Sequence, residues 1–326
     1  MHLRGIGYAF AASLMFGLGA VLAKLVSSEI DAALVAFLDL AVGGLLLIVC
    51  LAFTRTAFFH QLSELKRTDW INLFLLACPG TSLPLLLIVA GFARSSALEG
   101  GFLLQLNGVA AMIFALLLLG ERIRLRQSLG ILLLLLGSTL VVLKGTQGGA
   151  WGSGGLGDLM ILAGAIGLGF GFIPAKRLTQ RIETLPLTAL RLLLGACTVL
   201  PFLAFQFLVG AHLLLWQPTL ITLWVTLPVY ILTNFCLGYL SQQEGLNLLK
   251  AWEMAAIMQT VPLFSTVFAL LLLHDTMTPI QAVGGLIAVL GGIVVSLSNK
   301  TLTPAVPVGI AHLEEVPGKD HAHPDS

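Results

Sequence analysis

Polar side chains that could do chemistry are rare in this chain, and most of them stand inside long apolar stretches. Placing an ionisable or amide group in hydrocarbon costs free energy, so such groups usually face a cavity or a polar partner. A carboxyl partly removed from water can also gain and lose a proton near neutral pH. In chain order the residues are Asp39, Glu99, Gln105, Asn107, Arg191, Asn234, Glu253 and Gln259. Their types favour solute binding and proton exchange over bond cleavage.

Two pairs of these residues share one spacing. Glu99 and Gln105 are six residues apart, as are Glu253 and Gln259, and Trp252 directly precedes the second pair. We predict that the two glutamates guard opposite mouths of a substrate pathway and that at least one carries a coupling proton. The full predicted pathway is Glu99, Gln105, Asn107, Asn234, Trp252, Glu253 and Gln259. The alternative is that the glutamates are solvated or bond nearby backbone at helix ends, and that the amides hold helices together.

Motifs of enzymes are missing or poorly placed. The sequence holds no HExxH and no GxSxG string. Residues 155–158 match the GxGD string of intramembrane aspartyl proteases, but Asp158 stands at a predicted helix start, where a carboxylate caps backbone N–H groups. His321 and His323 stand in a polar tail, and the cysteines are single residues in apolar runs. We therefore expect no enzyme activity, no cofactor and no metal site.

The composition indicates that lipid is the solvent for most of the chain. Hydrophobic residues make up 57% of the 326 residues and charged residues only 10%, with a mean hydropathy of +0.98, whereas a soluble domain carries about 25% charged residues. Apolar stretches of about 20 residues, each long enough to cross the bilayer as a helix, recur along the chain. They predict an all-α membrane protein with ten transmembrane helices at 5–25, 32–53, 70–91, 96–119, 126–143, 157–175, 187–209, 219–240, 250–273 and 279–298.

The second half of the chain repeats the first. Residues 119–130 align with residues 273–284, so that Glu121 matches Asp275, and nearly the same offset aligns Lys24 with Lys176. Five helices per copy is an odd number, so the second copy must enter the membrane from the opposite side. We predict two inverted five-helix repeats over 1–145 and 146–298, followed by a disordered cytoplasmic tail over 299–326.

Lysine and arginine residues set the expected orientation. With the N-terminus in the cytoplasm, thirteen of them fall in cytoplasmic segments and only Lys24, Arg94 and Lys144 in outer loops, with Arg191 inside a helix. The positive-inside rule then places both termini in the cytoplasm, and we expect a bacterial-type inner membrane. A net charge of +1 gives no reason to expect nucleic acid as a partner. The expected partners are the lipid bilayer and a small-molecule substrate, and the expected state is a monomer or weak dimer.

Several short stretches resemble the EamA domain family of the drug/metabolite transporter superfamily. They are Leu-Leu-Gly-Glu-Arg at 118–122 with Gln127 and Gly130 after it, Gly-Asp-Leu at 157–159, and Gln-Thr-Val-Pro-Leu-Phe at 259–264. The resemblance covers 5–298 as two EamA units. It implies a permease that moves small metabolites, amino acids or drugs, often outward and in exchange for protons. We therefore expect a secondary transporter that exports a small organic metabolite or drug by alternating access; a channel or a lipid-handling membrane protein is the alternative.

Prolines mark the helices that are expected to form the site. Pro79 and Pro84 interrupt the helix at 70–91, and Pro228 interrupts the corresponding helix at 219–240. Such paired interruptions point to a central binding site. We expect a cavity between the helices at 70–91, 96–119, 219–240 and 250–273, with help from 5–25 and 157–175. Asp39 and Arg191 occupy equivalent positions in helices that start on opposite faces, so we expect no direct pair, and Arg191 can instead snorkel to the cytoplasmic face.

Overall fold

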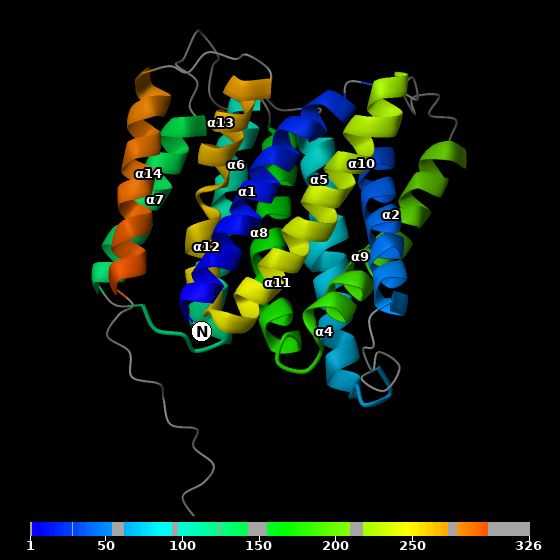
Figure 1. Ribbon diagram of the computed structural model, residues 1–326, viewed down its shortest axis with the longest axis horizontal. Coiled ribbons are helices and arrows are strands. Elements are labelled where there is room, and N and C mark those ends of the chain that lie inside the picture. Colours follow the sequence, from blue (N-terminus) through cyan, green and yellow to red (C-terminus); the bar gives the residue numbers. More distant parts are fainter. Residues whose placement is uncertain are drawn as a thin grey trace, which may run out of the picture.

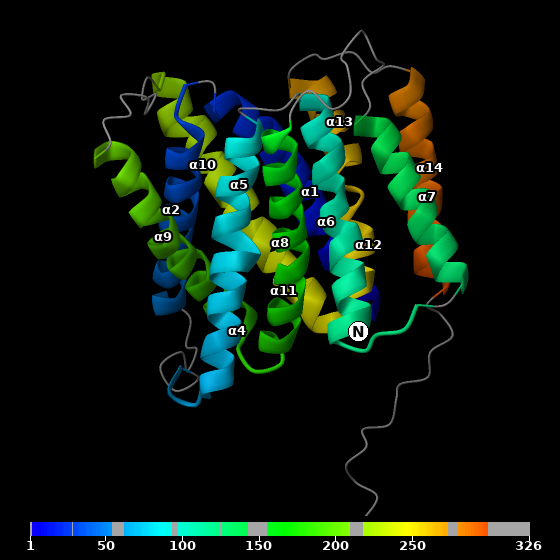
Figure 2. The ribbon, with the colours of Figure 1, turned by 180° about the vertical axis from the view of Figure 1, so that it is seen from behind.

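The structure is a computed structural model, and it describes residues 2–27, 29–53, 62–92, 97–123, 125–142, 155–208, 218–272 and 279–298. The regular elements in these ranges are helices, which stand side by side in one bundle (Figures 1 and 2). The prediction of an all-α protein is confirmed for this part of the chain. We call the end of the bundle at which α1 begins, marked N in Figure 1, the N-terminal end. The predicted tail lies outside the described residues.

The helices follow the predicted apolar stretches. The first half contains α1 (His2–Ser27), α2 (Ala32–Phe53), α4 (Arg67–Ala77), η1 (Cys78–Ser82), α5 (Leu83–Phe92), α6 (Ala97–Leu118) and α7 (Leu125–Val142). The second half contains α8 (Leu156–Leu178), α9 (Thr184–Leu208), η2 (Thr222–Thr226), α10 (Leu227–Tyr230), η3 (Ile231–Gly238), α11 (Tyr239–Leu248), α12 (Ala251–Met258), α13 (Val261–Leu272) and α14 (Pro279–Ser298). Adjoining segments such as α4, η1 and α5 form one continuous helical stretch.

Seven of the described helical stretches are long and apolar enough to cross a membrane. Three shorter apolar segments lie at 106–118 in α6, 127–137 in α7 and 282–291 in α14, so the count of ten spans stays a prediction. Apolar side chains cover the outside of the bundle. For example, Phe53 is 85% exposed and Trp224 is 74% exposed. Exposure of large apolar side chains on this scale is expected where hydrocarbon rather than water surrounds the helices.

Two glycine contacts relate the halves of the chain. Helices α7 and α14 pack on each other (Figure 1). A Cβ atom at Gly137 would lie 2.6 Å from the carbonyl oxygen of Gly284, and one at Gly291 would lie 2.8 Å from that of Gly130. Because Gly130 and Gly284 are equivalent in the repeat, as are Gly137 and Gly291, exchanging the halves maps one contact onto the other. This self-complementary contact is what a two-fold relation between two copies produces, and the absence of side chains lets the two backbones approach this closely.

Irregular turns interrupt the helices that carry the prolines. The π-helical turn η1 contains Pro79 and is followed by Pro84, while the π-helical segments η2 and η3 flank α10, which contains Pro228. Proline lacks a backbone N–H and so breaks the regular hydrogen-bond ladder, and π-helical turns are often found at functional sites. A further break at Gln259 and Thr260 separates α12 from α13.

Candidate functional site

A cavity of about 320 Å³ lies inside the bundle, and its wall draws on both hydrophobic clusters of the core. The first half contributes α1, α5 and α6, and the second half contributes α8, α9, α10, η3, α11 and the junction of α12 with α13. These include the helices expected from the sequence, with α9 in addition. The volume is at the lower end of the range of ligand pockets, about 300 to 1,000 Å³, and suits a small solute.

Arg191 of α9 is buried in the cavity wall, with 4% of its surface exposed. Its Nε donates to the hydroxyl oxygen of Thr81 at 2.8 Å, and one terminal nitrogen donates to the side-chain oxygen of Gln242 at 3.2 Å. Its Cζ atom lies 4.1 Å from the centroid of the Tyr239 ring, within the range of a cation–π contact. Thr81 belongs to η1 and donates in turn to the carbonyl oxygen of Leu76 at 2.7 Å. The π-helical turn thus places the hydroxyl that holds the guanidinium.

Asp39 of α2 lies one layer behind the cavity wall, with 1% of its surface exposed. Its side chain forms a hydrogen bond with Tyr230, whose side chain lines the cavity. The other carboxyl oxygen, Oδ1, has no hydrogen-bond partner among the described atoms. Asp39 is also not among the polar contacts of Arg191, in agreement with the prediction that these two residues do not pair.

Two amides of the cavity wall lie against glycines of facing helices. The side chain of Asn234 lies where a Cβ atom at Gly19 would stand, 2.5 Å from its Oδ1. Similarly, the side-chain nitrogen of Gln259 fills the space beside Gly108. Any larger residue at these glycines would displace an amide that faces the cavity. Another amide of the wall, Asn107, donates to the carbonyl oxygen of Leu104 at 2.8 Å.

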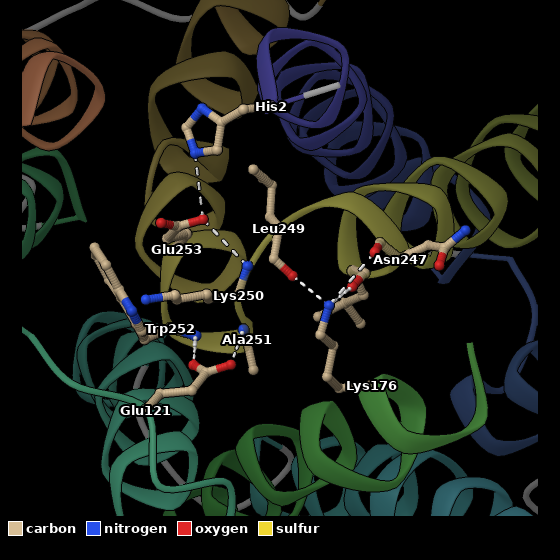
Figure 3. Close-up of polar contacts among 10 residues, drawn as sticks. His2, Glu121, Lys176, Asn247, Leu249, Lys250, Ala251, Trp252 and Glu253 are labelled. Carbon is tan, nitrogen blue, oxygen red and sulfur yellow. Dashed lines mark hydrogen bonds and ion pairs between the residues drawn. The ribbon is translucent and has the colours of Figure 1, made fainter. Parts of the chain in front are cut away.

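A polar cluster holds the turn between α11 and α12 at the N-terminal end of the bundle (Figure 3). Lys176, near the end of α8, donates through Nζ to the carbonyl oxygens of Leu246 and Leu249, the latter at 2.6 Å. The two carboxyl oxygens of Glu121 accept from the backbone N–H groups of Ala251 and Trp252 at 2.9 and 3.1 Å. A cation therefore meets the end of α11 and an anion the start of α12, which is the favourable arrangement for both helix dipoles.

Glu253 belongs to this cluster and caps its own helix. Its Oε2 accepts from the backbone N–H of Lys250 at 3.1 Å and lies 3.4 Å from Nε2 of His2 (Figure 3). Asp69 has the same position in α4, where its Oδ2 accepts from the backbone N–H of Lys66 at 3.1 Å. A carboxylate in the first turn that returns to the residue before the helix is one half of a capping box. The contacts of Glu253 are therefore those of a residue that fixes a helix start.

At the opposite end of the bundle, the side chain of Glu29 connects two segments of the chain by hydrogen bonding. Glu29, after α1, accepts from the backbone N–H of Thr219 at 2.6 Å. This backbone hydrogen bond is the main reason that the pKa of Glu29 is lowered from its ordinary value of 4.5. Glu29 thus joins the turn between α1 and α2 to the start of the helical stretch that leads to α11.

The predicted pathway residues fall into three groups. Asn107, Asn234 and Gln259 line the cavity. Trp252 and Glu253 are buried in the cluster at the N-terminal end and are not part of the cavity wall. Glu99 and Gln105 lie in the helix α6, and their side chains are outside the described part of the structure.

The sequence did not indicate that the described cavity wall contains a charged residue, Arg191. The prediction that Arg191 snorkels to a membrane face is wrong, because its guanidinium is buried and bonded to Thr81 and Gln242. Gln242 and Tyr239 were not singled out either, although both line the cavity. The available signal was the position of Arg191 itself, an arginine inside an apolar stretch.

The arrangement of two similar halves around a cavity agrees with a comparison of the sequence with known families. The family described as the EamA-like transporter family matches residues 3–143 and again residues 155–297. The chain belongs to the EamA-like transporter family. It therefore contains two EamA repeats and is a multi-pass membrane protein, and membership of the family supports a role in transport rather than enzyme catalysis.

Two individual proteins are similar to this EamA protein over most of their length. One is described as an uncharacterized transporter from Methanothermobacter thermautotrophicus; it is 20% identical over 312 residues, which cover 89% of this chain and 85% of that protein. The other is a protein solved by crystallography, with a TM-score of 0.74 and 16% sequence identity, where the match covers 90% of this chain and 96% of that one. The second similarity concerns the fold alone.

Proposed function

We propose that this protein is a secondary transporter that exports a small organic metabolite or drug across the inner membrane, in exchange for protons and by alternating access. The observation that carries the proposal is the cavity between the two repeats, with polar groups of both halves in its wall. Positive-inside counting places the N-terminal end, with its polar cluster, in the cytoplasm. We therefore propose that the N-terminal end closes the cavity toward the cytoplasm in this conformation.

The seal at the N-terminal end is made of packed side chains as well as hydrogen bonds. Trp252, Met254 and Ala255 of α12 are fully buried there, and Glu121 and Lys176 hold the turn before them. A channel requires a continuous polar path, and this packing interrupts it. A carrier fits better, because it must close one side of its site while the other side is open.

The relation between the two repeats provides a mechanism by which the cavity closes at one end of the bundle and opens at the other. The reciprocal contact between α7 and α14 relates the halves by a two-fold operation, and such a pair of halves can adopt two arrangements, related by exchange of the halves, around a fixed central site. In the second arrangement the turn between α11 and α12 separates from Glu121 and Lys176, and the opposite end of the bundle closes.

Exchange of protons for solute needs a carboxyl side chain that contacts the cavity or a residue of its wall. Three carboxyl side chains in the described part of the chain are buried: Asp39, Asp69 and Glu253. The last two cap helix starts, whereas Asp39 bonds Tyr230 of the cavity wall. Asp39 therefore joins Glu99 and Glu253 as a candidate for the proton-coupling group.

The direct test is efflux and counterflow in proteoliposomes. Proteoliposomes that hold the purified protein are loaded with an extract of small cellular metabolites and diluted into buffer, and mass spectrometry identifies solutes that leave faster than from protein-free liposomes. We expect a small set of released solutes, each of which, when placed inside, accelerates uptake of its isotope-labelled form from outside. Release without such counterflow would indicate a channel, and no selective release would contradict transport of small solutes.

A further inference from the structure

Arg191 carries the only full charge in the cavity wall, as far as the wall is described. The remaining polar side chains there are the amides of Asn107, Asn234, Gln242 and Gln259 and the hydroxyls of Tyr230 and Tyr239. No carboxylate of a described residue lines the cavity. The described part of the wall is therefore positively charged and otherwise neutral.

The partners of Arg191 hold the guanidinium without neutralising it. They are a hydroxyl of Thr81, an amide oxygen of Gln242 and the ring of Tyr239. A guanidinium has five N–H donors and stays charged in proteins, and the two hydrogen bonds use only two of them. Burying a charge without a counterion costs free energy in a protein and more so within a membrane. An anionic ligand in the cavity would reduce this cost.

We infer that the cavity binds a small monocarboxylate, with its carboxylate on the free N–H donors of Arg191 and an apolar body against Phe16, Phe172 and Met258. The planar fork of an arginine suits a carboxylate because two parallel hydrogen bonds can form. The three apolar residues belong to the cavity wall and provide the hydrophobic surface that holds most small ligands. The inference rests on the proposed function, since it names the chemical class of the transported solute.

The composition of the wall also predicts which solutes bind poorly. An organic cation would bring its charge close to Arg191 and would find no carboxylate among the described wall residues. A neutral amide of the same shape would occupy the same space but would leave the guanidinium uncompensated. Discrimination should therefore follow the charge of the ligand more closely than its size.

The test is a thermal-stability measurement on the purified full-length protein in detergent. The probes are benzoate, phenylacetate and 3-methylbutanoate, each beside its uncharged amide, and benzylamine as an organic cation. A ligand that binds only the folded state raises the melting temperature in a saturable way. We expect at least one carboxylate to do so, and its amide and benzylamine to have no comparable effect at the same concentration.

Variants of Arg191 assign the effect to this site. Arg191→Lys keeps the charge but loses the fork, and should weaken binding of the carboxylate by about tenfold or more; Arg191→Gln should abolish it. Arg4→Gln is the control, because it removes an arginine charge from an exposed position of α1 and should bind as the wild type does. If the glutamine variant does not fold, the lysine variant decides.

Three results would overturn the inference: stabilisation by none of the carboxylates, equal stabilisation by an amide or by benzylamine, or unchanged binding in the Arg191 variants. These outcomes are separate from failure of the proposed function. If a carboxylate binds but no counterflow occurs in proteoliposomes, the protein is not a carrier, although the anion site is supported. If an organic cation shows counterflow and no carboxylate binds, the protein is a carrier but the anion site is wrong.

Discussion

The guanidinium of Arg191 lies 4.1 Å from the ring centroid of Tyr239, inside a cavity that both repeats of the chain enclose. Arg191 comes from α9, Tyr239 from the start of α11, and the hydroxyl of Thr81 that holds the arginine comes from η1 in the first repeat. Movement of one repeat against the other would therefore change the surroundings of this charge. The position of the guanidinium therefore links the binding of a solute to the arrangement of the helices.

Gly108→Ala should alter transport with little effect on folding. A Cβ atom at this position would overlap the end of the Gln259 side chain, and because that end is flexible we expect the amide to move rather than the backbone. We predict a change of about three- to tenfold in the half-saturation concentration for counterflow, corresponding to roughly one hydrogen bond, with the melting temperature nearly unchanged. Gly7→Ala, where no atom lies within 4 Å of the added carbon, should leave both values unchanged.

Glu121→Ala should open the cavity toward the N-terminal end of the bundle, which is cytoplasmic in the proposed orientation. The substitution removes both acceptors from the start of α12, and loss of a helix cap costs about 1 kcal/mol. In a variant without native cysteines, Ala175→Cys reports on the cavity wall next to Lys176. We expect a membrane-impermeant thiol reagent added from the cytoplasmic side to react with this cysteine about fivefold faster when Glu121 is absent, the factor that 1 kcal/mol gives. An unchanged rate would show that Glu121 does not hold the cavity closed.

Asp39→Asn should remove proton-driven accumulation and keep exchange of solute for solute. The asparagine preserves the size and can still bond Tyr230, but it cannot bind and release a proton. Glu253→Gln is the comparison variant, because its carboxyl caps α12 and the amide oxygen can still accept that bond. Accumulation driven by a pH gradient is measured for both. Loss in the Glu253 variant alone would assign the coupling role to Glu253, one of the two glutamates that the sequence offered for it.

Glu29→Gln should lower stability at neutral pH and have no effect in acid. The backbone N–H of Thr219 lowers the pKa of Glu29 below its ordinary value of 4.5. A lowered folded-state pKa means that the ionised carboxylate stabilises the fold above its unfolded pKa, and that this contribution is lost as the pH falls through the folded pKa. Melting temperatures of the wild type and the variant should therefore converge between neutral pH and pH values below the folded pKa. A constant difference across this range would contradict the assignment.

The helices and the repeat could be predicted because both appear as patterns in the amino-acid sequence. Apolar stretches set the length of each helix, and the paired interruptions at Pro79 and Pro228 indicated which helices surround the centre. Three of the amides that were singled out, Asn107, Asn234 and Gln259, line the cavity. Polar residues inside an apolar helix carry this information because lipid is a poor alternative environment for them.

The positions and contacts of the charged side chains could not be predicted in the same way. Arg191 is held in the wall by Thr81 and Gln242, which are 110 and 51 residues away in the chain, so local sequence does not show whether it points inward or to a membrane face. The contacts of Glu253 depend on where α12 begins, since only a residue in the first turn can bond Lys250. A shift of that boundary by one turn would remove this bond.

In the proposed mechanism a solute crosses the membrane through the cavity between the two repeats. Ala20→Trp fills this cavity from α1, because Ala20 lines it, while Leu45→Trp adds the same side chain at a position of α2 that is 57% exposed on the outside of the bundle. The deciding measurement is counterflow in proteoliposomes with these two variants and the wild type. Passage of the solute through this cavity requires that Ala20→Trp abolishes counterflow while Leu45→Trp retains the wild-type rate; equal rates in all three proteins would show that the solute does not pass through it.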